Sequence, residues 1–542
     1  MTDSTTSPDQ SGPMLAADGT PLKKSLRRAL RRQKMRALLL ISPLLIFILV
    51  TFIAPIADML FRSVENDIVG DTLPRTVTVL VDWDPDTDEL PSEGTYRALY
   101  VDMFVAAERK AHTRLGTRLN YEMTGISSLF RRTGRDVDDF GELYQDQFVA
   151  LNEAWEDPMV WARIFGDADW VAEAEGADKP GPDFVPRDAA ATALPTTAEV
   201  YAEFAEFLQT EDNDNPVEED PWSLLYTALY WDLARNGFDY AGPEAELIAE
   251  AAAAVPGFET ASMKENFLDS DKDWGNPEVW ATIQTYSPRY TPGYFLNAAD
   301  MQLTPDGIEQ RPANEQIYWI LFKRTIFMSM TITISCILLG YPVAWLLANL
   351  PMRTANLLMI LVLLPFWTSL LVRTSAWKVM LQQQGVINDV LVWIGLVDDS
   401  SRLIMINNQF GTIVAMTHIL LPFMILPLFS VMATIPPTYM RAAKSLGATD
   451  WTAFWRVYFP QSVPGIGAGS ILVFILAIGY YITPEIVGGT TGTFISNRIA
   501  YHISSSLNWG LAAALGTILL AAVLILYWAY DRIVGIDNVK LG

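Results

Sequence analysis

Residues 436–467 read PPTYMRAAKSLGATDWTAFWRVYFPQSVPGIG, and this stretch decides the fold that the sequence predicts. Long apolar segments flank it, so we expect a loop beside a membrane, yet its pattern is that of two short helices. Pro437 suits the first position of a helix, and Gly447 suits the left-handed position that ends one. One face of this first helix is formed by Tyr439, Ala442, Ala443 and Leu446.

A second short helix is predicted after Gly447. Thr449 or Asp450 can cap its start, and we expect Pro460 to end it. Its apolar face consists of aromatic side chains at helical spacing, namely Trp451, Phe454, Trp455 and Tyr458. Large aromatic side chains on the polar side of a membrane need a partner to bury them, which favours a docking surface over an ordinary surface hairpin.

This stretch resembles the cytoplasmic coupling loop of importer-type ABC permeases, which reads Glu-Ala-Ala, three residues, Gly, and then an aromatic segment ending in Pro and Pro-Gly. The matching residues are Ala442, Ala443, Leu446, Gly447, Ala448, Phe454, Val457, Pro460, Pro464 and Gly465. Arg441 stands where the family usually has Glu, which puts in doubt a salt bridge that the Glu would make. The resemblance implies that Arg441 and the matching residues form the contact with ATPase subunits.

The charge of the chain is segregated, which the net charge of −24 conceals. Residues 62–314 carry 50 acidic and 18 basic residues, whereas the rest of the 542-residue chain carries 12 and 20. With 51% hydrophobic and only 18% charged residues, the composition is typical of a membrane protein. The single Cys336 excludes an internal disulfide, and the three scattered histidines suggest no metal site.

The N-terminal part predicts a cytoplasmic tail and a first membrane span. Residues 1–36 form the basic tail, and within it residues 23–36 hold eight Lys and Arg residues and no acid. Residues 37–61 are apolar and long enough to cross a bilayer as a helix. No cleavage site follows cleanly, so we expect an uncleaved span entering from the cytoplasm rather than a signal peptide.

Residues 62–314 are predicted to be an acidic, mainly helical extracytoplasmic insertion. Their apolar runs are too short to cross a membrane, but their many tryptophans and their length suffice for a folded core. Alternation over Arg75–Trp83 predicts a strand. Helices are predicted over Thr95–Phe130, Leu143–Ile164 and Pro243–Ala254.

Residues 315–535 are predicted to hold the other five spans, and residues 536–542 a cytoplasmic tail. The apolar segments lie near 325–349, 355–372, 412–435, 465–486 and 509–533. Counting from a cytoplasmic N-terminus places the loop 436–467 in the cytoplasm and the insertion outside. Charge agrees, because the cytoplasmic tails and loops hold 14 Lys and Arg residues and the short outer segments hold six.

Several further motifs resemble permeases of the spermidine/putrescine type. They are Gly340-Tyr341-Pro342, the segment Leu364–Thr374, Leu421-Pro422-Phe423 and the segment Gly479–Glu485. Pro365 should bend its span, and the short apolar piece 387–397 is predicted to lie along the outer surface. The resemblance covers about 318–535 and only weakly 37–61; it does not cover 62–314.

The sequence carries no catalytic signature of its own. It has no phosphate-binding loop of the form Gly-x₄-Gly-Lys-Ser/Thr, no Gly-x-Ser-x-Gly and no His-Glu-x-x-His. The resemblance implies a non-catalytic, six-span permease of the type I ABC importer kind in a bacterial inner membrane, with both termini cytoplasmic. It implies no cofactor on this chain, ATP and Mg²⁺ on a partner ATPase, a second permease subunit or second copy, and an extracytoplasmic binding protein. Nothing in it suggests nucleic acid.

Few residues are candidates for the solute path. Glu485 and Asp58 are the acids within or at the outer end of a span, where an ionisable group is costly and often functional. Tyr480, Tyr481 and Trp367 can offer ring faces to an ammonium group. A polyamine is the implied cargo, with an opine, an amino acid, thiamine or ferric ion as alternatives. A different class of function, a tethered receptor or enzyme acting through 62–314, would leave the coupling loop without a purpose.

Overall fold

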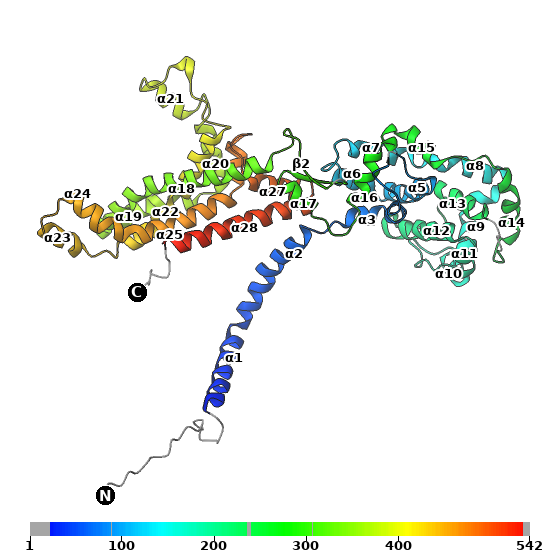
Figure 1. Ribbon diagram of the computed structural model, residues 1–542, viewed down its shortest axis with the longest axis horizontal. Helices are drawn as coiled ribbons and strands as arrows, with labels where there is room; N and C mark the ends of the chain where they lie inside the picture. Colours follow the sequence, from blue (N-terminus) through cyan, green and yellow to red (C-terminus); the bar gives the residue numbers. More distant parts are fainter. Residues whose placement is uncertain (1–21, 88, 236–239, 306, 535–542) are drawn as a thin grey trace, which may run out of the picture. The chain divides into compact units, whose positions relative to one another are not determined.

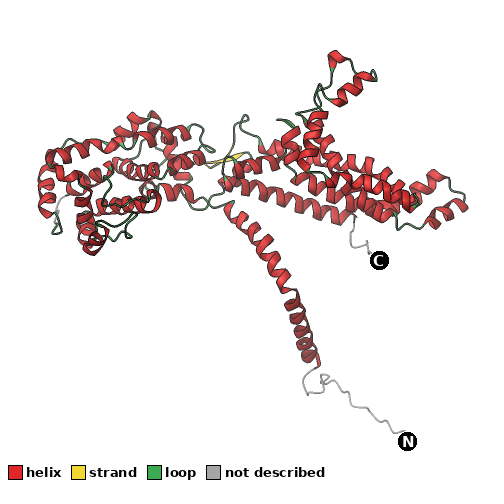
Figure 2. Ribbon diagram, turned by 180° about the vertical axis from the view of Figure 1, so that it is seen from behind, coloured by secondary structure: helices red, strands yellow, loops and turns green. Residues whose placement is uncertain are grey.

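The computed structural model describes residues 22–534 except 88, 236–239 and 306, and this part is built almost entirely of helices (Figure 1, Figure 2). The strands described, β1 (Met301–Thr304) and β2 (Gly307–Gln310), form an antiparallel hairpin. The predicted fold class, an all-α membrane protein with a mainly α insertion, is therefore confirmed. Of the predicted tails, residues 1–21 and 536–542 lie outside the described residues.

The N-terminal unit is one long apolar helix. It comprises α1 (Leu22–Ile48), a π-helical turn (Leu49–Ile53) and α2 (Ala54–Arg62). From Gln33 to Arg62 its mean hydropathy reaches 2.8, so the span predicted at 37–61 lies inside a helix long enough to cross a membrane.

The helices of the acidic insertion form a second region with its own core. In chain order they are α3 (Asp67–Thr72), α4 (Pro74–Leu80), α5 (Glu93–Glu108), α6 (Ala111–Leu119), α7 (Ile126–Asp136), α8 (Glu142–Leu151), α9 (Pro158–Phe165), α10 (Ala168–Ala174), α11 (Asp188–Ala193), α12 (Pro195–Phe207), α13 (Ser223–Leu233), α14 (Ala245–Ala254), α15 (Met263–Ser270), α16 (Pro277–Thr285) and α17 (Gly293–Ala298). Aromatic side chains dominate the core, in which Trp155, Trp161, Trp274 and Trp280 are fully buried. Burial of such large rings is what stabilises a region this acidic.

The structure corrects several local predictions in the insertion. The strand predicted over Arg75–Trp83 is wrong, because Pro74 starts helix α4 and buries Thr76 and Leu80 on one face. The helix predicted over Thr95–Phe130 is three helices, with left-handed residues at Lys110 and Gly125 between them. A 3₁₀ turn (Glu153–Glu156) likewise divides the helix predicted over Leu143–Ile164.

The C-terminal region contains the remaining apolar helices. They are α18 (Tyr318–Asn349), α19 (Met352–Leu363), α20 (Leu370–Met380), α21 (Val386–Trp393), α22 (Gln409–Met432), α23 (Pro437–Ser445), α24 (Asp450–Ala453), α25 (Phe459–Gly479), α26 (Ile482–Val487), α27 (Ile495–Ser504) and α28 (Trp509–Val534). Helices α18, α22 and α25 pack together around a core that includes Met328, Met424 and Val473. Five described helices have the length and hydropathy of a span, and α19 with α20 makes six if that bent pair is one span.

The bend between α19 and α20 occurs where Pro365 was expected to produce one. A 3₁₀ segment (Leu364–Trp367) separates the two helices, which meet at 95°. Proline removes a backbone donor and clashes with the preceding turn, so the helix cannot continue straight. The helix predicted near 387–397 is present as α21.

The expectation that Pro460 ends the second short helix is wrong. Helix α24, a π-helical segment (Phe454–Tyr458) and α25 run on without a break from Asp450 to Gly479. Pro460 directly follows the π-helical segment, whose wider turn gives the ring room inside the continuous helix.

A polar junction joins the insertion to the start of α18. The Asp300 carboxylate accepts hydrogen bonds from the backbone N–H groups of Ile317, Tyr318 and Trp319 at 2.7–3.0 Å, which caps α18. His502 of α27 contacts both sides, since its Nε2 lies 3.1 Å from the Tyr318 hydroxyl and its ring packs edge-on against Tyr121. Burial lowers the pKa of His502 to about 4.

Candidate functional site

The first helix of the coupling segment, α23, ends in a Schellman motif. Gly447 has φ +90°, its N–H donates to Lys444 O at 3.0 Å, and the N–H of Ala448 donates to Ala443 O at 3.1 Å. A Cβ built on Gly447 would meet no atom within 4 Å, so only the backbone conformation calls for glycine. The predicted roles of Pro437 as first helical residue and of Gly447 as left-handed cap are confirmed.

The second half of the coupling segment begins at Thr449. Between the two candidate caps the structure selects this residue, whose Oγ1 accepts from the backbone N–H of Thr452 at 3.3 Å. Because α24 passes through the π-helical segment into α25, the second helix of the coupling segment and the span that follows it form one continuous helix from Asp450 to Gly479.

An exposed apolar patch, here named the coupling face, lies on this segment. It consists of Tyr439, Leu446, Trp451 and Trp455, whose exposed fractions are 50, 89, 72 and 44%. Ala442 is exposed beside these side chains, and Ala443 is half-buried. Four large apolar side chains exposed on one short polar segment are a feature of an interaction surface.

The other two predicted aromatic residues face the bundle instead. Phe454 is half-buried and Tyr458 is buried, and both pack against the core of α18, α22 and α25. The Tyr341 ring meets Phe454 edge-on, and its hydroxyl lies 2.9 Å from Ser462 Oγ. The π-helical segment widens the turn, so side chains at α-helical spacing in the sequence point to two sides.

Gly465 has a packing role, whereas Pro460 is exposed. A Cβ at Gly465 would come within 3.1 Å of Val431 Cβ and 3.2 Å of Leu428 Cα, so glycine allows α25 to approach α22 closely. Pro460 lies in the first turn of α25 and is exposed.

The charges of the coupling segment are unequally satisfied. Lys444 forms an ion pair with Asp450 across the turn. Arg441 is exposed and forms no ion pair with any residue that the structure describes. The exposed Arg441 guanidinium therefore occupies the position at which the family usually has a Glu carboxylate.

Three of the predicted path residues are brought together at the turn between α25 and α26. Asn497 Nδ2 donates to Glu485 Oε2 at 2.6 Å and to Tyr481 O at 3.0 Å. Ser496 Oγ donates to Tyr480 O at 2.7 Å. Helix α27 thus holds the whole turn, while the Glu485 side chain and the Tyr481 ring stay exposed.

The other two predicted path residues are not joined to this turn. Trp367 ends the 3₁₀ segment at the bend and is 71% exposed, and its side chain forms no hydrogen bond or ring contact with Tyr480, Tyr481 or Glu485 in the described structure. Asp58 belongs to the N-terminal unit, where it pairs with Arg62 at 2.7 Å, and both side chains are exposed.

Sequence reasoning missed a set of hydroxyl groups inside the helix bundle. The side-chain hydroxyls of Ser329, Thr417 and Ser470 are shielded from solvent and have no hydrogen-bond partner in the described structure. They come from α18, α22 and α25, the three helices that pack together. Single hydroxyl residues in apolar segments carry no sequence signal, so only the packing reveals them. Among the described residues no group of three or more His, Cys, Asp and Glu side chains could hold a metal ion.

Comparison with known proteins identifies relatives of the C-terminal region. Residues 326–534 match the family model "Binding-protein-dependent transport system inner membrane component". The chain is 33% identical over 222 residues to the spermidine/putrescine transport system permease protein PotB of Salmonella typhimurium (strain SL1344), which covers 40% of this chain and 77% of that protein. It is 31% identical over 258 residues to the inner membrane ABC transporter permease protein YdcU of Escherichia coli (strain K12), covering 45% and 80%. A bacterial alginate ABC transporter structure matches at 19% identity and a TM-score of 0.33, covering 40% and 78%.

Proposed function

The chain belongs to the binding-protein-dependent transport system inner membrane components, and from this membership we propose that it is the solute-conducting subunit of an ATP-driven importer. Its described helices and the names of its relatives make it a multi-pass permease of an inner membrane. The drive by ATP, the delivery of solute and the identity of that solute are the proposed part.

One observation supports the coupling to ATP above the others. The coupling face is exposed on a helix–turn–helix whose second helix continues without a break into α25. A helix is stiff along its axis, so movement of a partner bound at Trp451 or Leu446 would be transmitted to the α25 span. The partner would be an ATPase chain that holds ATP and Mg²⁺, since this chain carries no phosphate-binding loop.

The proposed orientation places the coupling segment and both termini in the cytoplasm. The eight Lys and Arg residues of 23–36 support this orientation, because they bring the total on the proposed cytoplasmic side to 14, against six in the short outer segments. The acidic insertion then faces the extracytoplasmic side, where a solute-binding protein would dock. A second permease chain, either another subunit or a copy of this one, would complete the path.

A polyamine is the solute that we propose. Relatives at 33% identity are named for spermidine and putrescine transport, and α27 binds the Glu485 carboxylate and the backbone carbonyls of Tyr480 and Tyr481, so one acidic and two aromatic residues belong to one turn. A carboxylate and aromatic faces are the groups that stabilise an ammonium ion. The buried hydroxyls of Ser329, Thr417 and Ser470 could accept hydrogen bonds from amines farther along the path.

Reconstitution tests this function directly. The permease, its companion permease, the ATPase and the binding protein encoded beside it would be placed in proteoliposomes, and ATP-dependent uptake of labelled putrescine and spermidine measured. Competition by unlabelled opines, amino acids, thiamine and ferric ion would separate the proposed cargo from the alternatives. Uptake of one of these solutes in place of polyamines would contradict the proposed cargo but would still support the proposed transport function.

Co-purification separates this function from a tethered receptor or enzyme. A permease binds its ATPase through the coupling face, so Trp451→Ser and Leu446→Ser should release the ATPase while the chain stays in the membrane. A tethered receptor would bring no ATPase with it, and these two substitutions would then change nothing.

A further inference from the structure

The insertion contains the same aromatic motif twice. One instance follows α8 and reads Asn152-Glu-Ala-Trp-Glu-Asp-Pro-Met-Val-Trp-Ala. The other follows α15 and reads Asp271-Lys-Asp-Trp-Gly-Asn-Pro-Glu-Val-Trp-Ala. Each forms a 3₁₀ turn followed by a helix that starts at proline. In each, the second indole N–H donates to the carbonyl of the first tryptophan, at 2.9 Å for Trp161 and 3.0 Å for Trp280.

A second pair of matching segments packs on these motifs in the same way. In both, a Leu-Pro step starts a helix (α4 and α12), and a later helix (α5 and α13) carries Tyr-x-Ala-Leu-Tyr-x-Asp. The Tyr96 hydroxyl donates to Trp274 O at 3.0 Å, and the Tyr226 hydroxyl donates to Trp155 O at 2.8 Å. The two aspartates each accept from the N–H and hydroxyl of one threonine, and these pairs are Asp102 with Thr76 and Asp232 with Thr197.

The two copies are also closed by equivalent bridges. An antiparallel bridge joins Gly166 to Pro186 in one copy, and another joins Glu65 to Tyr290 in the other. We name the two copies by where they begin in the chain. The first copy is split between α3–α5 and α15–α16, and the second copy runs continuously from α8 to α13. The insertion is therefore an internal duplication, and the chain enters and leaves it through the middle of one copy.

Comparison of the two copies shows which residues their shared fold requires. Several residues recur in both copies because the fold needs them. The Leu-Pro steps start α4 and α12, the aspartates bind the threonines in the first turns of these helices, and the tryptophans fill the core. Asp71 and Arg75 do not recur, since the second copy has Thr192 and Thr196 at these places. These two charges are thus not a requirement of the shared fold, whereas Asp102 recurs as Asp232.

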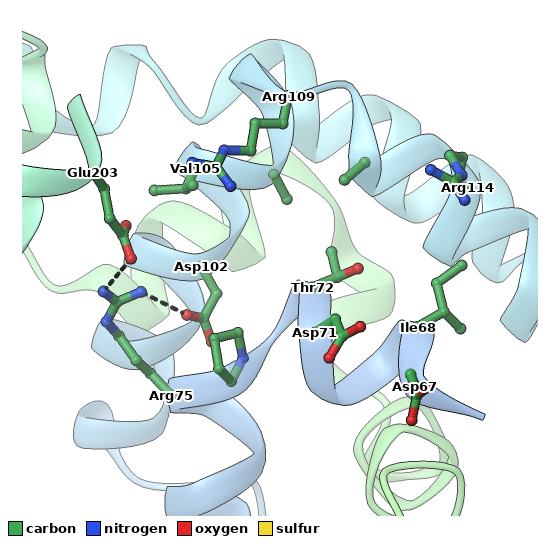
Figure 3. Close-up of a pocket in the computed structure, with 13 residues that line it drawn as sticks. Asp67, Ile68, Asp71, Thr72, Arg75, Asp102, Val105, Arg109, Arg114 and Glu203 are labelled. Carbon is green, nitrogen blue, oxygen red and sulfur yellow. Dashed lines mark hydrogen bonds and ion pairs between the residues drawn. The ribbon is translucent and has the colours of Figure 1, made fainter. Parts of the chain in front are cut away.

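Asp71 and Arg75 line a groove of about 450 Å³, whose walls come from α3 to α6 and, at Glu203, from α12 of the second copy (Figure 3). We name it the charged groove, and its charged walls are Asp67, Asp71, Arg75, Asp102, Arg109, Arg114 and Glu203. In Figure 3 Asp67 and Asp71 lie on α3, whereas Arg109 and Arg114 come from the chain that follows α5 and from α6. A volume of this size is that of a small-molecule site.

Most of these charges are already paired, and two are not. Arg75 binds Asp102 at 3.2 Å and Glu203 at 2.7 Å, and Asp67 binds Arg289 at 3.1 Å. Arg109 reaches Glu211 only at 3.6 Å. Asp71 and Arg114 form no hydrogen bond or ion pair with each other or with any other described residue. One free carboxylate and one free guanidinium therefore border the same groove.

We propose that the charged groove binds a small zwitterion, with its ammonium group at Asp71 and Asp67 and its carboxylate at Arg114 and Arg109. A dication would meet three arginines here and a dianion would meet four carboxylates, whereas a ligand carrying both charges complements both walls. Bidentate pairing of a carboxylate with a guanidinium would supply the orientation. This site is separate from the solute path, and it does not depend on which solute is transported.

Three ligands of one length test the charge requirement. The full chain in lipid nanodiscs would be titrated by calorimetry with 4-aminobutanoate, 1,4-diaminobutane and butanedioate, which share a four-carbon chain and differ in charge. We expect 4-aminobutanoate to bind at least about tenfold more tightly than either of the others at this site. Asp71→Asn and Arg114→Gln should each weaken its binding by about tenfold, and both side chains are exposed, so the fold should persist.

Matched substitutions outside the groove serve as controls. Asp188→Asn changes the exposed counterpart of Asp67 in the second copy, and Arg135→Gln changes an exposed arginine of α7; neither should alter binding. Any binding of diaminobutane in the solute path would be unaffected by Asp71→Asn. Binding of 4-aminobutanoate weaker than about 1 mM, or unchanged in both groove variants, would overturn the proposal. So would tighter groove binding of the dication or the dianion.

Discussion

Asn497 Nδ2 and Glu485 Oε2 are joined by a 2.6 Å hydrogen bond between α27 and α26. Asn497 also accepts from the backbone N–H of Phe494 at 3.0 Å, so its amide is fixed in one orientation. The bond ties the candidate cation-binding carboxylate to the outer helix that also carries His502. A solute that competes for Glu485 would therefore also act on the position of α27.

The first prediction follows from this bond. Glu485→Gln keeps an oxygen that can accept from Asn497 but removes the charge, so the fold should persist while the KM for putrescine uptake rises by about tenfold. Asp398→Asn is the control, because it removes another exposed carboxylate from the segment between α21 and α22. An unchanged KM in the Glu485 variant would remove this residue from the path.

The second prediction concerns the cap of α23. Gly447→Val forces a β-branched residue to φ +90°, at a cost of about 1–2 kcal/mol, and should tilt α23 away from α24. We expect ATP hydrolysis to continue in the reconstituted complex while putrescine uptake fails. Gly447→Asn is the matched control, since asparagine tolerates this conformation, and it should transport. Normal uptake by the valine variant would refute the coupling role.

The third prediction tests the orientation of the chain. In a Cys336→Ala background, a cysteine at the exposed Glu218 of the insertion should react with a membrane-impermeant thiol reagent added to spheroplasts. A cysteine at the exposed Thr438 of α23 should react only after the membrane is opened. The reverse pattern would contradict the proposed six-span topology.

The fourth prediction concerns the pH dependence of the junction between the insertion and α18. Burial holds the pKa of His502 at about 4, below its ordinary 6.5, so folding favours the neutral ring. The stabilisation is complete above about pH 6.5 and is lost as the pH falls toward 4, by about 1.4 kcal/mol per unit. The protection factors of the Tyr318 and Tyr121 amides should fall over this range, so exchange accelerates relative to the intrinsic rate at each pH. His502→Gln should abolish this pH dependence. Acceleration that persists in the glutamine variant would assign it to another group.

The fifth prediction concerns the role of the acidic insertion. The bridge between Glu65 and Tyr290 marks a site where a short linker can replace residues 66–289. The Asp300 cap of α18 remains in this variant, whereas the contact between Tyr121 and His502 is lost. If the insertion steers a basic binding protein, uptake by this variant should fall at limiting binding protein, and the deficit should shrink as salt rises. Such steering acts over roughly 8 Å at physiological salt. Equal uptake at low salt would exclude a docking role.

The local patterns of the coupling segment were sufficient to predict its caps. Pro437 and Gly447 act through their own backbone and nearest neighbours, so their roles can be read from spacing alone, whereas the spacing left Thr449 and Asp450 as alternative caps. The aromatic positions of the second helix were predicted as one face, but the π-helical segment turns Phe454 and Tyr458 inward. That segment is stabilised by contacts with Tyr341, a residue more than one hundred positions away, and no local pattern encodes it.

The duplication was not recognised in the sequence because its first copy is split by the point where the chain enters and leaves. Its motifs are short, and the matching segments occur in a different order along the chain. Only the repeated hydrogen bonds of Trp161 and Trp280, and the two bridges, show that the segments occupy equivalent places.

The sequence by itself determined the apolar spans, the charge segregation, the caps of α23 and the family resemblance. These properties depend on composition and on residues within a turn or two of one another, where spacing dictates geometry. The tertiary structure alone decided that Asn497 holds Glu485, that α24 continues into α25, and that Asp71 and Arg114 border one groove without pairing. These relationships depend on which distant helices pack together, and that is set by the burial of many side chains at once rather than by any local pattern.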